Sequence, residues 1–161
     1  MTPSLEQVAR IMQEYGVHCI VIGGWAAIIH GAARSTNAID FVYARDAENA
    51  HRLVEALRPW KPYLRGAPPG LLFHWDEQTV RAGLNFTLTT RLGDLDLLGD
   101  VPGGGTYEKL LPYAETVTAF NVACQIVSLE RLIQLKRASG RPKDLEIIAE
   151  LQALLDERRK G

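Results

Sequence analysis

The feature that most constrains the fold is an apolar, strand-like run that leads directly into two glycines. Residues 18–22, HCIVI, are short, apolar and rich in branched side chains, which is typical of a buried strand. Gly23 and Gly24 follow at once and predict a tight turn. Residues 25–31 then fit a short helix, and the run AIDFVY at 38–43 predicts a second strand.

The rest of the chain predicts an α+β fold. Polar caps, glycines and prolines delimit expected helices at 5–15, 47–58, 106–114, 128–139 and 141–160, and strands at 85–91, 94–98 and in a hairpin over 115–127. Residues 59–72 hold four prolines and two glycines and predict an irregular surface excursion, while 73–83 are ambiguous. We expect a small mixed sheet flanked by helices, mainly on one face, with a helical C-terminal end.

The length of 161 residues predicts a single domain over residues 1–161, with a core of about 15–127 and C-terminal helices at about 128–158. Apolar residues make up 47% and charged residues 23%, and the formal net charge is −1. This composition is typical of a globular protein and argues against both disorder and a broad nucleic-acid-binding groove.

The expected location is the cytoplasm, without membrane contact. The first 16 residues contain acids and lack the basic start and apolar run of a signal peptide. No apolar stretch approaches the roughly 18 residues that a membrane span requires. Cys19 and Cys124 lie in apolar runs, where free cysteines behave as small hydrophobic side chains.

Three aspartates are candidates for a metal site. Asp40 lies in the middle of the second strand, where a carboxylate is costly unless it faces water, a partner or a metal. Asp94 and Asp96 are two residues apart and therefore share one face of a strand. Carboxylates on facing strands suit Mg²⁺, and two such ions can clamp a phosphoryl transfer. Each aspartate alone also fits a structural role at a strand edge or in a surface ion pair.

The glycine pair complements these acids. Without side chains, Gly23 and Gly24 allow backbone N–H groups to approach a phosphate, although a glycine pair before a helix is also common as a simple turn.

Several motifs together resemble the nucleotidyltransferase superfamily with the DNA polymerase β fold. VIGGWAAIIHGAARSTNAIDF resembles its first signature, in which a strand, a glycine pair and a helix precede a strand with two acids. LGDLDLL resembles the strand of the third acid, and LIQLKRASGRPKDLEIIAEL resembles the tail of small bacterial proteins related to the AbiEii-type toxins of type IV toxin–antitoxin systems. The resemblance covers about residues 15–155.

The resemblance assigns a role to each matching position. Gly23 and Gly24 fall on the phosphate-contacting turn, and Asp40 falls on the second metal acid. Asp96 matches the third acid, with Asp94 as the alternative. The first metal acid is replaced by Ala38, whose methyl group cannot coordinate Mg²⁺. The resemblance therefore implies a two-metal site that is weakened in this chain.

Basic residues complete the candidate site. Arg34 and Ser35 precede the acid strand, and a second group lies where the last two helices meet: Lys136, Arg137, Arg141 and Lys143. Such residues also fit a solvated helix end. The functional interpretation, which the resemblance supports, is that Lys136 and Lys143 bind phosphates and that Asp144 orients them.

The expected function is transfer of a nucleoside monophosphate from an NTP, with Mg²⁺, by a toxin-type enzyme that Ala38 has inactivated. The acceptor would be an RNA end such as that of tRNA, a protein hydroxyl or a small drug, and a cognate antitoxin is a possible partner. The alternative is a non-catalytic module that binds nucleotide or a partner protein, as an antitoxin-like degenerate relative. Ala38 is either natural or an introduced change, and the survival of Gly23, Gly24, Asp40 and Asp96 favours the latter.

Overall fold

Seven strands form one mixed sheet in the order β3-β4-β5-β2-β1-β7-β6 in the computed structural model, which describes residues 2–160. The strands are β1 (Cys19–Ile22), β2 (Ala38–Tyr43), β3 (Tyr63–Leu64), β4 (Asn85–Thr90), β5 (Gly93–Leu98), β6 (Ala114–Ala119) and β7 (Val122–Val127). β2 pairs with β1 in antiparallel and with β5 in parallel orientation, so the centre of the sheet is mixed, as expected.

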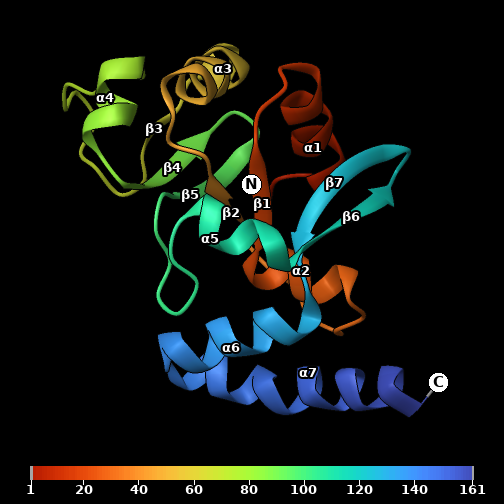
Figure 1. Cartoon of the computed structure of the whole chain (residues 1–161). Helices are drawn as coiled ribbons and strands as arrows, with labels where there is room; N and C mark the ends of the chain where they lie inside the picture. The colour runs from red at the N-terminus through yellow and green to blue at the C-terminus, as the bar shows by residue number, and fades with distance from the viewer. Residues whose placement is uncertain (1, 161) are drawn as a thin grey trace.

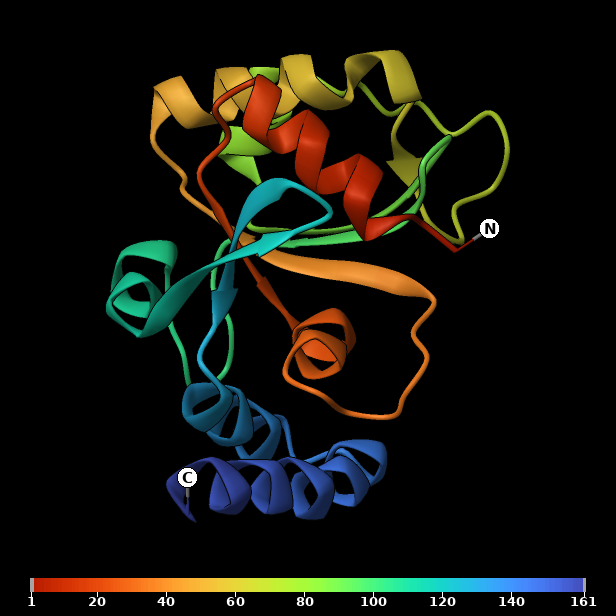
Figure 2. The same cartoon turned by 90° about the vertical axis from the view of Figure 1, so that its right-hand side faces the viewer.

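Helices cover both faces of this sheet. They are α1 (Leu5–Glu14), α2 (Gly23–Ile29), α3 (Ala47–Leu57), α4 (Glu77–Ala82), α5 (Tyr107–Leu110), α6 (Leu129–Ser139) and α7 (Pro142–Lys160), with 3₁₀ turns η1 (Arg58–Trp60) and η2 (Leu111–Tyr113). α1 and α3 lie on one side, and α2, α6 and α7 on the other (Figures 1 and 2). The expectation of helices mainly on one face is wrong, because β1 and the end of β2 carry buried apolar side chains on both faces of the sheet, and each face is covered by helices.

The predicted helix starts are confirmed by their caps. The side chains of Ser4, Asp46 and Ser128 accept hydrogen bonds from the backbone N–H three residues later, which satisfies one donor of each first turn. Gly140 ends α6 with a φ of 65°, a left-handed conformation that glycine adopts without strain. The short connection to α7 places the two C-terminal helices side by side (Figure 1).

The proline-rich excursion is more ordered than the sequence predicts. It contributes β3, which pairs with β4 at the sheet edge, and the Tyr63 hydroxyl donates to the carbonyls of Pro68 (2.6 Å) and Leu71 (3.0 Å). The ambiguous segment contains α4, whose cap is Asp76. β3 is two residues long, so it has no periodic pattern that the sequence could reveal.

His30 attaches the C-terminal helix to the sheet. Its ring is buried and donates from Nε2 to the Val127 carbonyl (2.7 Å), while Nδ1 accepts from Arg158 of α7 (3.0 Å). Burial lowers the pKa of His30, which keeps the ring neutral and able to accept. Within residues 2–160, no helix combines the length and the apolar character of a membrane span.

Candidate active-site cleft

Strand pairing brings two of the predicted acids side by side. β2 and β5 run parallel with Asp40 opposite Asp96 and Ala38 opposite Asp94. Burial, and then the neighbouring charge of Asp96, raise the pKa of Asp40 to about 7, although Lys136 and Arg141 oppose the shift. Two carboxylates in this arrangement favour a shared cation, because each disfavours the charge of the other.

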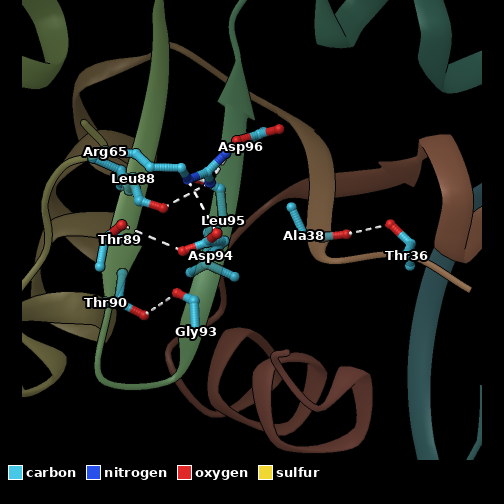
Figure 3. A network of polar contacts seen from close by, with 10 residues as sticks. All are labelled: Thr36, Ala38, Arg65, Leu88, Thr89, Thr90, Gly93, Asp94, Leu95 and Asp96. Atoms are coloured by element: carbon cyan, nitrogen blue, oxygen red, sulfur yellow. Dashed lines mark hydrogen bonds and ion pairs between the residues drawn. The ribbon is translucent and has the colours of Figure 1, made fainter. Parts of the chain in front are cut away.

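The glycine pair makes room for this acid. Gly23 has a φ of 68°, and a Cβ built on it would collide with the carboxylate of Asp40. A Cβ on Gly24 would come within 2.8 Å of the Cβ of Thr36, whose hydroxyl donates to the Ala38 carbonyl (3.0 Å; Figure 3). The turn therefore packs directly against the start of the acid strand, which explains why both positions are glycine.

A polar cleft of about 420 Å³ opens over these acids. Of the predicted site residues, it is lined by Gly24, Arg34, Ser35, Asp40, Asp96, Lys136, Lys143 and Asp144. An adjoining, more apolar hollow of about 290 Å³ includes Gly23 and shares Asp40, Asp96, Lys136 and Arg141 with the cleft. Asp94 lines neither hollow, and Arg137 lines a separate one beside Arg159. The fold thus brings together most of the residues that the sequence singled out, from five distant segments.

Asp144 holds the basic side of the cleft in place. Its side chain is only 2% exposed and accepts from Lys136 Nζ (3.3 Å), Arg141 Nε (2.7 Å) and Ser139 Oγ (2.7 Å). Burial alone would raise the pKa of this carboxyl, but the hydrogen bonds from Arg141, Ser139 and Lys136 outweigh it and lower the pKa to about 2. Asp144 is therefore ionised and links α6 to α7 at the cleft wall.

We predict that Asp144→Asn lowers the free energy of unfolding at pH 7 by about 2 kcal/mol, since it removes a buried partner of two cations. The native pKa lies below the ordinary 3.8, so this stabilisation is complete above pH 4 and is lost as the pH falls toward 2. Urea unfolding of both chains at pH 7 and pH 3 measures it, with the exposed Asp156→Asn of α7 as control. Equal stability at pH 7 would contradict the role of Asp144.

Arg34 also lines the cleft, but its positive charge is paired with the carboxylate of Glu150. Its Nε donates to Glu150 Oε1 of α7 (3.0 Å), and the other oxygen of Glu150 accepts from the Ala33 N–H (2.8 Å). The loop before β2 is thereby tied to the C-terminal helix α7.

Arg65 is a site residue that sequence reasoning missed. Its Nη2 donates to Asp96 Oδ1 (2.8 Å), and its Nε lies 3.3 Å from Asp94 Oδ2 (Figure 3). It lines the same cleft. No motif marks this arginine, because it follows the two-residue strand β3 inside the proline-rich excursion. Only the pairing of β3 with β4 carries it to the acids.

A separate cavity of about 310 Å³ lies between α1 and strands β1 and β7, on the opposite face of the sheet. It is mostly apolar and is lined by both free cysteines, Cys19 and Cys124. Burial raises the pKa of Cys19 to about 12 and that of Cys124 to about 11, so both thiols are protonated. This cavity has no carboxylates, and the acidic cleft is the better candidate for phosphate chemistry.

The acids fit one divalent cation. Among residues 2–160, no group of three or more His, Cys, Asp and Glu side chains is arranged to hold a metal ion. Asp40 and Asp96 supply two adjacent carboxylates, and Mg²⁺ in proteins commonly takes one or two carboxylates and completes its shell with water and substrate phosphates. The pair therefore suits one divalent cation that keeps open positions for other ligands.

Solved structures share this architecture. The lincosamide antibiotic adenylyltransferase LnuA, solved with lincomycin bound, matches with a TM-score of 0.63 at 14% identity, over 96% of this chain and 99% of that chain. The chain has a nucleotidyltransferase fold. A nucleotidyltransferase-like antigenic protein from Paracoccidioides brasiliensis matches with a TM-score of 0.59 at 14% identity, over 94% of this chain and 73% of that chain.

A further nucleotidyltransferase-fold neighbour is ANT(2″)-Ia, solved in complex with adenylyl-2″-tobramycin. It matches with a TM-score of 0.54 at 12% identity, over 97% of this chain and 95% of that chain. At these identities the likeness concerns the fold. No protein-family model matches the chain, and no curated protein sequence does.

Proposed function

We propose that this chain binds a nucleoside triphosphate with Mg²⁺ in the acidic cleft and belongs to the enzymes that transfer a nucleoside monophosphate to an acceptor. The observation that carries the proposal is the in-register pair Asp40 and Asp96, which lines a cleft with a basic wall and of which Asp40 packs against Gly23. We further propose that residues 1–161 act as one domain, since the C-terminal helices supply that wall.

Each cleft residue then has a role in binding. Asp40 and Asp96 hold the metal, and the backbone of Gly23 and Gly24 approaches the phosphates. Lys136 and Lys143 bind the triphosphate, and Arg34 and Ser35 line the same cleft. When bound, the metal ion neutralises charge that develops on the phosphate oxygens.

In the proposed reaction, an acceptor oxygen forms a bond to the α-phosphorus as the bond to pyrophosphate breaks. The protein contributes chiefly position and charge. Ala38 lies on the same face of β2 as Asp40, where the resemblance expects the first acid. Since a methyl group cannot bind a metal, we propose that this chain transfers nucleotides slowly or not at all.

The acceptor and partner follow from the resemblance and the charge of the cleft. The likeness of residues 132–151 to toxin tails supports a toxin-type protein in the cytoplasm, with a cognate antitoxin and an RNA acceptor such as a tRNA end. The local basic wall suits a phosphate-bearing acceptor despite the net charge of −1. A protein hydroxyl and a small hydroxylated drug, as for the antibiotic-modifying neighbours, are the other acceptor classes to test.

A non-catalytic nucleotide-binding module is the second candidate. Two observations favour it: the methyl group of Ala38 at the first acid position, and the ion pairs of Arg65 with Asp94 and Asp96, which occupy carboxylates with a protein cation. Such a module would keep NTP binding and lack transfer. A partner protein would then recognise the nucleotide-bound form of the module.

Calorimetry with ATP and Mg²⁺ tests the binding function common to both candidates. Lys136→Ala and Lys143→Ala are each expected to weaken ATP binding by about tenfold or more, because each removes a charge-assisted contact to phosphate. Lys143 is exposed, so its loss leaves the fold intact. Lys160→Ala, with a side chain that is 75% exposed at the other end of α7, is the matched control. Unchanged affinity in both cleft variants, or no ATP binding by the starting chain, would overturn the proposal.

A further inference from the structure

Arg65 is held more firmly than a surface arginine. Besides its contact with Asp96, Nη2 donates to the backbone carbonyls of Leu88 (2.7 Å) and Leu95 (3.3 Å), on the two strands that flank it. Its side chain is only 29% exposed. These contacts fix the guanidinium across β4 and β5 next to the acids (Figure 3), so its charge is a permanent part of the site.

The two aspartates of β5 differ in how this arginine engages them. Asp94 Oδ1 accepts from Thr89 Oγ1 (3.3 Å), and Oδ2 forms an ion pair with Arg65 Nε at 3.3 Å, without the geometry of a hydrogen bond. Asp96 contacts Arg65 through Oδ1 alone and lines the cleft beside Asp40. Asp94 lines neither of the hollows over the acids.

We propose that Arg65 is a built-in counter-cation of the acidic cluster, which withholds Asp94 from metal binding and leaves Asp40 and Asp96 to hold a single divalent ion. This inference rests on the proposed function, because it assumes that the cleft takes up a divalent ion. The positive charge of Arg65 also offsets the repulsion among the three aspartates near Ala38, because its guanidinium lies against the two acids of β5.

Mn²⁺ binding, followed by electron paramagnetic resonance without nucleotide, tests the assignment. We expect one Mn²⁺ per chain. Asp94→Asn should leave its affinity within about threefold, whereas Asp96→Asn should weaken it at least tenfold, since only Asp96 is a ligand. Arg65→Gln should tighten Mn²⁺ binding about tenfold, because the guanidinium no longer competes for Asp96 Oδ1.

Arg45→Gln is the matched control for Arg65. Arg45 also donates to backbone carbonyls, of Arg81 (3.4 Å) and Gly83 (2.8 Å), but it lines neither hollow over the acids, so Mn²⁺ binding should not change. Near-ultraviolet circular dichroism checks that each variant is folded. If Arg65→Gln does not fold, the comparison of Asp94→Asn with Asp96→Asn still decides the assignment of the ligands.

Three results would overturn the inference: equal losses in Asp94→Asn and Asp96→Asn, no gain in Arg65→Gln, or no bound Mn²⁺ in the starting chain. These failures are distinct from a failure of the proposed function. The latter would appear as an absence of ATP binding or as its independence of Lys136 and Lys143, both of which are measured separately.

Discussion

Ala38→Asp is expected to raise the rate of nucleotidyl transfer by roughly a thousandfold, from a level near background. The new carboxylate would lie two residues before Asp40 on the same face of β2, and beside Asp94 on β5. With Asp40 it would form the acid pair that a second metal ion needs. A second ion contributes several kcal/mol of charge stabilisation, and each 1.4 kcal/mol changes the rate tenfold.

The measurement is transfer of label from α-labelled NTPs with Mg²⁺ and total RNA, for the starting chain and the variant in parallel. Ala38→Asn is the control for size, because its amide matches the carboxylate in shape without its charge. Ala38→Asp combined with Asp40→Asn should return the rate to background. Absence of transfer in every chain, with ATP binding retained, would favour the non-catalytic module over the enzyme.

Gly23→Ala is expected to abolish divalent-ion binding and to lower the free energy of unfolding by about 3 kcal/mol. The first cause is the backbone, since the φ of 68° costs a residue with a Cβ about 1–2 kcal/mol. The second is steric, because the added Cβ would collide with the carboxylate of Asp40 and displace it from Asp96. Urea unfolding and Mn²⁺ titration measure the two effects.

Gly70→Ala separates these two causes. Gly70 has a φ of 89° and would place its Cβ in open space, with no atom within 4 Å. Its substitution should cost about 1–2 kcal/mol and leave Mn²⁺ binding unchanged. If Gly23→Ala binds Mn²⁺ as well as Gly70→Ala does, the carboxylate of Asp40 is not held against the Gly23 turn.

The local patterns of this chain predicted most of its elements. Three features depend only on residues close by in the sequence: the helix caps, the end of α6 at Gly140, and the unit of strand, glycine pair, helix and strand. A short stretch of sequence is therefore enough to predict them. The pairing of Asp40 with an acid of the 94–98 strand also followed, from the resemblance and from the two-residue period of a strand. At that level Asp96 was the better match for this acid, and Asp94 remained the alternative.

By itself, the sequence determined the helices and strands of an α+β chain and located Asp40 and Ala38 on one strand face. Tertiary structure alone decided which side chains meet. The parallel register of β2 with β5 places Asp40 beside Asp96, and the two-residue strand β3 delivers Arg65 to the acids. These outcomes depend on hydrogen bonds between strands far apart in the chain, for which a local pattern contains no signal. The sequence therefore indicated an acidic site, and the pairing of the strands determined that an arginine, Arg65, lies beside its aspartates.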